Sequence, residues 1–277
     1  MTVLEVLTAA TDYLRKQEVE SPRLNAEHLL AKVLGKKNRI ELYLDFERPL
    51  GDLERAPLRD LVRRRGEGTP LQHLLGTVDF LGLSLLSDPR ALIPRPETEQ
   101  LVGFVLAESS WQSVWDIGTG TGAIALALAT KRPSASVAAG DVSADALSLA
   151  RENAARLELA GRVSFFESDL LEGFSGPVEA IVANLPYIPT GDIAGLSREV
   201  GHDPVLALDG GADGLALIRR LAAGAAQKLP PGGLIALEVG HDQAARTADL
   251  LAAHNFRDIS VRRDYQGIER FLIARNG

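Results

Sequence analysis

The sequence predicts a doubly wound α/β fold with a mostly parallel, seven-stranded sheet, preceded by a small helical domain. From residue 113 onward, short apolar runs alternate with stretches of helical periodicity, which is typical of βα units and a parallel sheet. From the N-terminus to about residue 66 the apolar spacing is helical. A chain of 277 residues has room for about two domains. We therefore expect a helical domain at 1–68, a hairpin and linker at 69–99, and an α/β domain at 100–277.

Local signals predict the N-terminal elements. Residues 1–16 carry apolar side chains on one helical face, and Pro22 after Ser21 suits the first turn of a second helix. The only three consecutive basic residues, the arginines at 63–65, are interpreted as the solvated end of a helix, where positive charge favours the negative end of the helix dipole. Alternating apolar and polar residues at 77–86 predict a β-hairpin.

The α/β domain begins with a helix whose first turn contains Pro96. Its last two strands are joined by a short connection without a helix, so we expect that pair to be antiparallel. The predicted strands lie at 113–117, 136–140, 163–167, 180–183, 234–239, 259–263 and 270–274. The predicted helices between them lie at 123–131, 144–157, 214–229 and 243–254.

Composition excludes several kinds of site. The chain has no cysteine, which excludes disulfides, thiolate zinc sites, iron–sulfur clusters and a cysteine nucleophile. Its five histidines show no metal-ligand spacing, so no metal site is predicted. The longest apolar runs, such as 123–129, are far too short to span a membrane, and the first helix is unlike a signal peptide. We expect a cytoplasmic protein that does not bind membranes.

The negative charge is concentrated in one part of the chain. Residues 1–90 carry 14 basic and 14 acidic side chains, whereas residues 91–277 carry 16 and 23, so the second part holds the whole net charge of −7. Such a domain repels phosphates unless a basic face is segregated on it. We therefore expect no stable binding of nucleic acid, and the balanced N-terminal domain is the better candidate for holding a protein partner.

A glycine loop follows the first predicted strand of the α/β domain. Residues 118–122 read Gly-Thr-Gly-Thr-Gly and lead directly into a helix. A strand, a glycine turn and a helix N-terminus form the nucleotide-binding crevice of a doubly wound sheet, and glycine leaves no Cβ between the backbone and a ligand. Asp141, which ends the next strand, can accept hydrogen bonds from the hydroxyls of a ribose.

Two kinds of cofactor suit this loop. As Gly-x-Gly-x-x-Ala it matches the dinucleotide fingerprint, whereas as Gly-x-Gly-x-Gly with Asp116 just before it, it resembles the S-adenosylmethionine loop of class I methyltransferases. A carboxylate so near the loop is unfavourable beside a pyrophosphate and suits the cationic amino-acid end of S-adenosylmethionine. Asp116 therefore favours S-adenosylmethionine.

A second motif, Asn-Leu-Pro-Tyr at 184–187, follows the fourth predicted strand at the carboxyl end of the sheet, where ligands bind. Pro186 fixes its own φ and pushes Leu185 into an extended conformation, so the backbone is stiff. The carboxamide oxygen of Asn184 and the carbonyl of Leu185 can accept both hydrogens of a planar NH₂ group, with the Tyr187 ring on its flat face. Such acceptors orient the nitrogen lone pair toward a sulfonium methyl, and no strong base is required.

With both motifs in place, the chain resembles the protein-(glutamine) methyltransferases that modify peptide chain release factors. The resemblance covers nearly the whole length and rests on 63–65, Gly76, 92–99, 116–122, Asp141, 168–169, 184–187, 208–211 and 213–215. It implies a class I S-adenosylmethionine-dependent methyltransferase fold, in which the helical domain recognises the substrate and the α/β domain is catalytic. It also implies methyl transfer to the glutamine amide nitrogen of the Gly-Gly-Gln loop in class 1 release factors, with S-adenosylhomocysteine as product. We expect the enzyme to be a monomer.

The expected site has two parts. Asn184 and Tyr187 are the expected catalytic residues, and with Leu185 and Pro186 they are expected to bind the substrate. The expected cofactor-binding residues are Gly118, Thr119, Gly120, Thr121, Gly122, Asp141, Asp169, Leu170 and Asn184. Two positions depart from the family pattern: Leu185 stands where proline is usual and keeps the backbone carbonyl, and Leu170 replaces an aromatic residue near the adenine and loses its stacking.

Three alternative functions are less compatible with the sequence. An adenine methyltransferase acting on RNA or DNA has a similar Asn-x-Pro-Tyr motif, but the negative charge of the catalytic domain disfavours it. A nicotinamide dehydrogenase needs an acid or base that handles a hydride, and no Tyr-x-x-x-Lys pair is present near a helix. A binding module without activity would not need both halves of the site.

Overall fold

The computed structural model describes residues 1–109 and 111–277 and divides into two compact units. The first unit comprises Met1–Thr77 together with Ser197–His202, and the second comprises Val78–Leu196 and Asp203–Gly277. The helical unit therefore extends beyond the predicted boundary at residue 68 and takes in the first part of the predicted linker.

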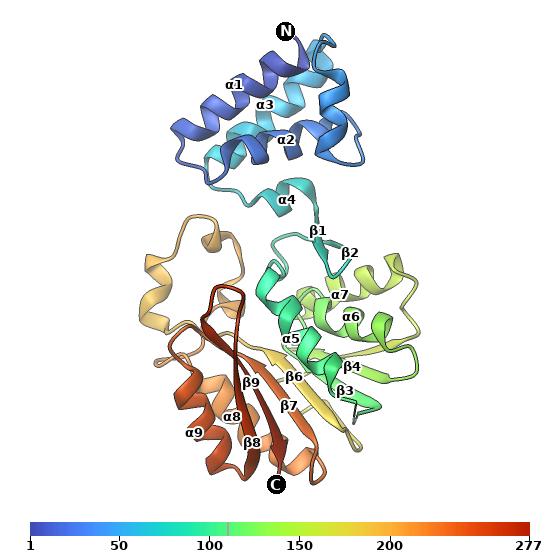
Figure 1. Ribbon diagram of the computed structural model, residues 1–277, viewed down its shortest axis with the longest axis vertical. Coiled ribbons are helices and arrows are strands. Elements are labelled where there is room, and N and C mark those ends of the chain that lie inside the picture. The colour runs from blue at the N-terminus through green and yellow to red at the C-terminus, as the bar shows by residue number, and fades with distance from the viewer. Residues whose placement is uncertain (110) are drawn as a thin grey trace. The chain divides into compact units, whose positions relative to one another are not determined.

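The first unit is helical, as its apolar spacing predicts. It contains α1 (Val3–Lys16), α2 (Pro22–Val33), a 3₁₀ segment (Arg39–Asp45), α3 (Asp52–Gly66) and α4 (Leu71–Leu75) (Figure 1). The side chain of Thr2 accepts a hydrogen bond from the backbone of Glu5 and Glu5 reciprocates, a capping box that fixes the start of α1. Buried leucines from the helices, among them Leu7, Leu14 and Leu30, form one core.

The three arginines at the end of α3 do not share one environment. Arg63 and Arg64 are exposed, as expected for a solvated helix end, but Arg65 is only 3% exposed. Its guanidinium donates to Asn25 Oδ1 at 2.6 Å and forms an ion pair with Glu199 at 2.5 Å, within the same unit. The interpretation of a solvated run is therefore wrong for Arg65, because a distant segment supplies acceptors that the local sequence does not reveal.

The second unit contains the predicted sheet. Its strands are β3 (Ser113–Ile117), β4 (Ser136–Asp141), β5 (Val163–Glu167), β6 (Ala180–Asn184), β7 (Leu234–Glu238), β8 (Phe256–Arg263) and β9 (Glu269–Asn276), in the order β5-β4-β3-β6-β7-β9-β8. The first five are parallel, and β9 is antiparallel to both β7 and β8. The predicted seven strands and antiparallel last pair are confirmed. The sheet order reverses between β3 and β6, the position where doubly wound folds bind ligands.

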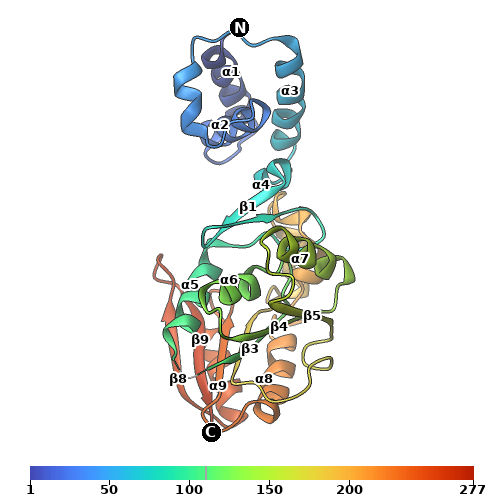
Figure 2. The same cartoon turned by 90° about the vertical axis from the view of Figure 1, so that its right-hand side faces the viewer.

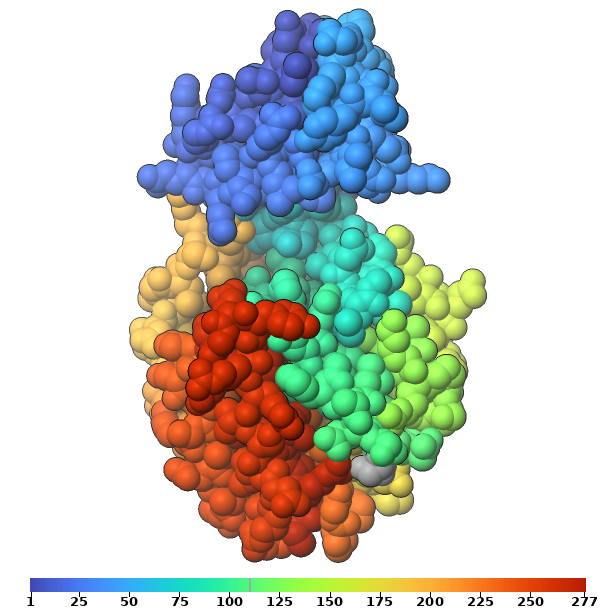
Figure 3. Space-filling model, viewed as in Figure 1, coloured from blue at the N-terminus to red at the C-terminus, as the bar shows by residue number. Residues whose placement is uncertain are grey.

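Helices cover both faces of this sheet. They are α5 (Pro96–Ala107), α6 (Ala123–Lys131), α7 (Ala144–Arg156), α8 (Ala216–Lys228) and α9 (Ala244–Ala253), and the predicted hairpin is β1 (Thr77–Phe80) with β2 (Leu83–Leu86). Figure 2 shows α6 and α7 beside β4 and β5. In Figure 3, α5 (green) lies beside the last strands (red), and the ring of Phe104 packs at 5.4 Å from that of Phe271.

Strand side chains alternate between the two faces, with consequences for the site. Val182 and Ala236 belong to the core packed on α5 and α6, whereas Ile181 and Ile235 belong to the core packed on α8 and α9. This alternation places the last residues of β6 and β7 on the α5 face. None of the described helices is long and apolar enough to cross a membrane.

Candidate functional site

A cavity of about 320 Å³ lies at the carboxyl ends of the strands in the second unit, within the size range of small-molecule sites. It is lined by both predicted motifs: Gly118 and Gly120 of the glycine loop, and Asn184, Leu185 and Pro186. Asp141, Asp169 and Leu170 also line it. Elements far apart in the sequence thus meet in one cavity, as the parallel sheet requires.

The glycine loop needs glycine for two different reasons. Gly118, Gly120 and Gly122 have φ values of +73°, +55° and +83°, in the left-handed region that side chains disfavour. A Cβ on Gly118 would lie 2.8 Å from Cδ2 of Leu185, so the two motifs approach each other closely. A Cβ on Gly122 would lie 3.2 Å from Cβ of Ala150, which makes Gly122 a packing residue between α6 and α7.

Three of the expected cofactor-binding residues do not line the cavity. The hydroxyl of Thr119 donates to Asp116, and the carbonyl oxygen of Thr121 accepts from the side chain of Asn153 at 3.0 Å. Gly122 makes the packing contacts described above. These residues shape the loop, while the lining comes from Gly118 and Gly120.

Asp141 joins the loop to the second strand. One carboxylate oxygen accepts from the backbone N–H of Gly120 at 2.8 Å, and the other accepts from that of Ser143 at 2.9 Å. Burial raises the pKa of Asp141, and the two backbone hydrogen bonds oppose this effect. Each oxygen keeps a lone pair for a further donor, so the carboxylate fits the predicted ribose hydroxyls.

Asp116 lies beneath the loop and is fully buried. Its Oδ2 accepts from the hydroxyl of Thr119 at 2.6 Å and from the backbone N–H of Ala125 at 3.1 Å, whereas no partner is found for the buried Oδ1 among the described residues. Burial raises its pKa to about 7. A buried carboxylate oxygen without a donor is rare. Asp116 does not line the cavity, so its negative charge acts on the cationic group of the expected cofactor only across the loop, without direct contact.

The opposite wall carries the expected adenine residues. Leu170 has a φ of +52° and is held there because the hydroxyl of Ser168 donates to its carbonyl oxygen at 2.8 Å. Asp169 forms an ion pair with Arg220 at 2.8 Å, and both side chains line the cavity. The wall thus presents an aliphatic side chain next to an ion pair, a suitable surface for a flat heterocycle with polar edges.

Asn184 is held by hydrogen bonds that its own motif does not predict. Its Nδ2 donates to Oγ1 of Thr98 at 3.0 Å, and that hydroxyl donates to Oε2 of Glu238 at 2.8 Å. Asn184 and Glu238 are register partners at the ends of β6 and β7, and both face α5, whose first turn carries Thr98. We call these three residues the Asn184 network.

The backbone after Asn184 is supported by the segment 208–215, here called the late loop. A Cβ on Gly210 would lie 2.8 Å from the carbonyl oxygen of Pro186, and one on Gly214 would overlap that of Tyr187. Gln243 donates from Nε2 to the Tyr187 carbonyl oxygen at 2.8 Å. The glycines of the late loop therefore allow two backbone segments to pack together and fix the path of the Asn184 motif.

Tyr187 is partly buried next to this network and does not line the cavity. Burial, followed by the nearby carboxylate of Glu238, raises the pKa of its hydroxyl, so the ring is a neutral packing surface at physiological pH.

An ion pair holds the segment 92–99 in place, because Arg95 pairs with Asp203 at 2.7 Å. This ion pair connects the segment to a second loop whose Pro204 and Leu206 line the cavity.

The sequence reasoning missed Thr98, Glu238, Gln243 and the Arg95–Asp203 pair. A signal for Glu238 was present, because it is the one charged residue in the buried strand Leu234–Glu238 and is only 2% exposed. A buried carboxylate needs a partner, which points to a polar network. Thr98 and Gln243 carry no comparable signal, since both residue types are common at helix starts. No group of three or more His, Asp or Glu side chains suited to a metal ion occurs within 1–109 or 111–277.

Comparison with known proteins agrees with both units. The family described as PrmC N-terminal domain matches residues 5–76, and the family described as methyltransferase small domain matches residues 98–195. The release factor glutamine methyltransferase of Deinococcus radiodurans is 46% identical, with 99% of each chain covered. That of Geobacter sulfurreducens is 40% identical, covering 100% of this chain and 97% of the relative.

Two solved structures share the fold. A methyltransferase from Pyrococcus furiosus has a TM-score of 0.56 at 19% identity and covers 71% of this chain and 90% of its own. The hMettl16 catalytic domain, solved with MAT2A 3'UTR hairpin 6, has a TM-score of 0.61 at 17% identity and covers 79% and 82%. Identities this low bear on the fold alone. The two structural matches confirm the predicted class I methyltransferase fold.

Proposed function

This chain belongs to the family of release factor glutamine methyltransferases, and from this premise we propose how its own residues perform the reaction. The methyl group passes from S-adenosylmethionine to the side-chain amide nitrogen of the glutamine in the Gly-Gly-Gln loop of class 1 release factors. The observation that carries this proposal is the position of Asn184, which lines the same cavity as the glycine loop while its NH₂ group is held by Thr98.

The glycine-loop side of the cavity is the proposed cofactor site. Gly118 and Gly120 admit the cofactor to the backbone, Asp141 accepts from the ribose hydroxyls, and Asp169 and Leu170 face the adenine. Asp116 places negative charge below the amino-acid end, and Thr119, Thr121 and Gly122 hold the loop in shape. When bound, S-adenosylmethionine supplies a methyl group on a positively charged sulfur.

The Asn184 side of the cavity is the proposed substrate site. Oδ1 of Asn184 and the carbonyl of Leu185 accept the two hydrogens of the glutamine amide, and Pro186 keeps that carbonyl in place. Tyr187 does not line the cavity of the free enzyme, and we propose that its partly buried ring packs on the flat face of the amide once the glutamine is bound. Two oriented acceptors favour a pyramidal nitrogen. One of its protons passes to solvent as the new N–CH₃ bond forms and the S–CH₃ bond breaks, so the residues need not include a strong base.

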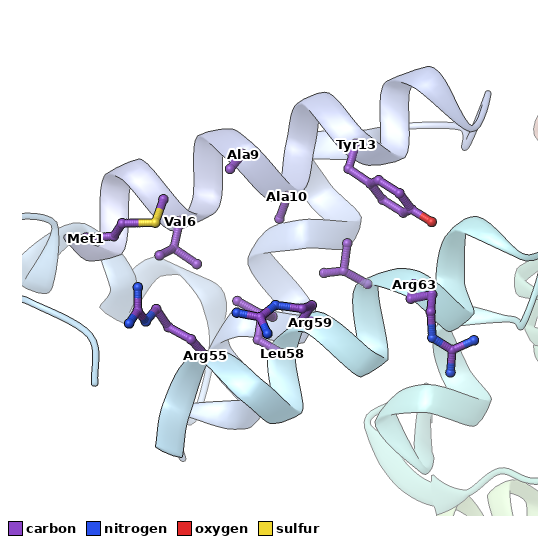
Figure 4. A pocket seen from close by; sticks show the side chains of 10 residues that line it. Met1, Val6, Ala9, Ala10, Tyr13, Arg55, Leu58, Arg59 and Arg63 are labelled. Carbon is purple, nitrogen blue, oxygen red and sulfur yellow. The ribbon is translucent and has the colours of Figure 1, made fainter. Parts of the chain in front are cut away.

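We further propose that the helical unit recognises the release factor through a groove between α1 and α3. The groove has a volume of about 470 Å³. Its floor is apolar, with side chains of Val6, Ala10, Leu58 and Val62. Figure 4 shows Arg55, Arg59 and Arg63 along one side of it, one turn apart on α3.

The charges of the groove define the kind of segment it accepts. Arg55 pairs with Asp52, and Arg63 pairs with Asp60 and Glu67, whereas Arg59 makes no ion pair with any described residue. An apolar floor beside a row of arginines is complementary to an amphipathic helix that carries carboxylates along one edge. The proposed occupant is such a helix on the surface of the release factor.

Charge reversal tests this surface. Arg59→Glu is expected to raise KM for the intact release factor about tenfold while kcat stays unchanged, because a rim charge contributes to docking and not to the chemistry. The matched control is Arg64→Glu, on the same helix but outside the groove. If both substitutions raised KM equally, the effect would be one of overall charge, and the groove would not be the docking site.

The activity is tested with cofactor labelled in its methyl group, offered either purified release factor or ribosomal RNA. Label is expected on the glutamine of the factor, located by peptide mass spectrometry, and not on RNA. Label on RNA alone would reverse the assignment in favour of the adenine alternative, which neither the charge of the domain nor its full-length relatives favour. We propose that the enzyme acts as a monomer in the cytoplasm, where release factors work.

A further inference from the structure

The Asn184 network contains two buried side chains, those of Thr98 and Glu238, to which the proposed reaction assigns no role. Glu238 is 2% exposed and Thr98 is 5% exposed, so neither side chain can exchange its partner freely with water. We propose that Glu238, acting through Thr98, sets which end of the Asn184 carboxamide faces the substrate, and that both are positioning residues. This inference rests on the proposed function, because it concerns the same amide-binding site.

The number of hydrogens in the network fixes the orientation of the Asn184 amide. The hydroxyl of Thr98 has one hydrogen and lies 2.8 Å from a Glu238 oxygen and 3.0 Å from Nδ2 of Asn184. An ionised carboxylate only accepts, so the hydroxyl hydrogen must point to Glu238. The oxygen of Thr98 then offers only lone pairs to Asn184. The amide must therefore turn its NH₂ group toward Thr98, which leaves Oδ1 for the cavity.

The opposite orientation would be inactive. If Asn184 turned its NH₂ group to the cavity, it would present two donors to a glutamine NH₂ group that also donates, and no hydrogen bond would form. The glutamine nitrogen would lose one of its two acceptors. Because an amide can turn over without changing its shape, packing alone does not choose between the orientations, and an external acceptor must do so.

The surroundings of Glu238 make this choice depend on pH. Facing it are Thr98 and Glu97 from α5, Asn184 and Tyr187 from the end of β6, and Arg270 from β9. Burial raises the pKa of Glu238 to about 7, although the hydrogen bond from Thr98, the charge of Arg270 and, least, the nearby amide of Asn184 oppose this rise. Below that pH the neutral carboxyl group can itself donate to Thr98, which frees the hydroxyl hydrogen for Oδ1 of Asn184 and reverses the amide.

Three variants test the network, with kcat and KM measured for the release factor between pH 5.5 and 8.5. Thr98→Val, which removes the acceptor for Nδ2, is expected to lower kcat/KM about a hundredfold, while Thr98→Ser is expected to stay within about threefold of the wild type. Glu238→Gln is expected to lower kcat/KM about tenfold and to abolish the rise of activity with pH near 7. The affinity for cofactor should not change in any of them.

The matched control is Thr247→Val. Thr247 is also fully buried in the second unit, and its hydroxyl has no partner among the described residues, so its loss should leave kcat/KM unchanged. Full activity of Thr98→Val, or equal losses in Thr98→Ser and Thr98→Val, would overturn the proposal. If Thr98→Val does not fold, Glu238→Gln decides, because it conserves volume: retention of the wild-type pH profile would refute the role of Glu238.

A second measurement does not depend on methyl transfer. The side-chain amide signal of Asn184, observed by NMR with ¹⁵N-labelled asparagine, should shift with the titration of Glu238 near pH 7 and remain constant in Glu238→Gln. A signal that does not move with pH in the wild type would contradict the network even if the enzyme methylates release factor. A wild type that shows the shift but labels no release factor would instead disprove the proposed function alone.

Discussion

The two halves of the cavity are built by different means. The glycine-loop half depends on backbone, with glycines at positive φ, and its Asp141 accepts hydrogen bonds from the backbone N–H groups of Gly120 and Ser143. The Asn184 half is made of side chains from three elements, because Thr98 and Glu238 orient Asn184. A backbone site tolerates changes in neighbouring side chains, whereas an oriented side chain depends on each member of its network. Substitutions in the glycine-loop half should therefore weaken cofactor binding, whereas substitutions in the Asn184 half should lower kcat.

The largest effect is expected at Asn184 itself. Asn184→Ala removes the acceptor for the substrate amide and should lower kcat by up to about a thousandfold, as the loss of a preorganised hydrogen bond to a reacting group does. The cofactor affinity should fall only slightly, because the glycine-loop half stays intact. Single-turnover methylation and calorimetric titration of cofactor measure the two quantities separately. Substantial turnover in this variant would refute the proposed role of Asn184.

A smaller effect in the same half is expected from Gly214→Ala. Its Cβ would overlap the carbonyl oxygen of Tyr187 and crowd Gln243, and backbone atoms cannot yield as a flexible side chain does. We expect kcat to fall about a hundredfold through displacement of the Asn184 motif, with little change in cofactor affinity. Gly232→Ala is the matched control, since its φ of +78° imposes the same backbone strain with no atom near the new Cβ. Similar losses in both variants would assign the effect to strain alone.

The opposite half is tested by Gly118→Ala. The new Cβ would stand at the cavity rim, 2.8 Å from the end of the flexible Leu185 side chain, which can move aside. Cofactor binding should weaken about tenfold, because the Cβ occupies space where the ligand approaches the backbone. The strain at positive φ should instead lower the stability of the fold, by about 1 kcal/mol or more. Activity at saturating cofactor should largely return. If kcat fell without a change in cofactor affinity, the two halves would not be separable.

The sequence predicts these halves to different extents, for a physical reason. A glycine loop between a strand and a helix, and the residues Asn184–Tyr187 at a strand end, are local patterns whose place in a parallel sheet follows from chain order. The seven strands were likewise predictable from short apolar runs, although β8 begins at Phe256, earlier than the predicted residue 259. The partners of Asn184 were not predictable, because Thr98 lies 86 positions away and meets it only through the register of β6 and β7 and the packing of α5.

The same difference explains Arg65, whose acceptors come from α2 and from Glu199. Its neighbours in the sequence suggest a solvated helix end, which Arg63 and Arg64 do form. Long-range pairing of polar side chains leaves no periodic trace in the sequence, whereas the burial of apolar faces does. Functional positioning in this protein therefore lies mainly in contacts that periodicity does not reveal.

The smallest effect is expected at Leu170, on the cavity wall that is proposed to face the adenine. Leu170→Phe places an aromatic ring on the wall proposed to face the adenine, on a backbone already at positive φ next to Ser168. Offset stacking on a heterocycle contributes about 0.5–1.5 kcal/mol beyond area burial, so cofactor affinity should increase by roughly two- to tenfold. Because this wall belongs to the glycine-loop half, kcat for the release factor should stay the same. Calorimetric titration of cofactor detects the change, and unchanged or weaker binding would show that Leu170 does not face the adenine.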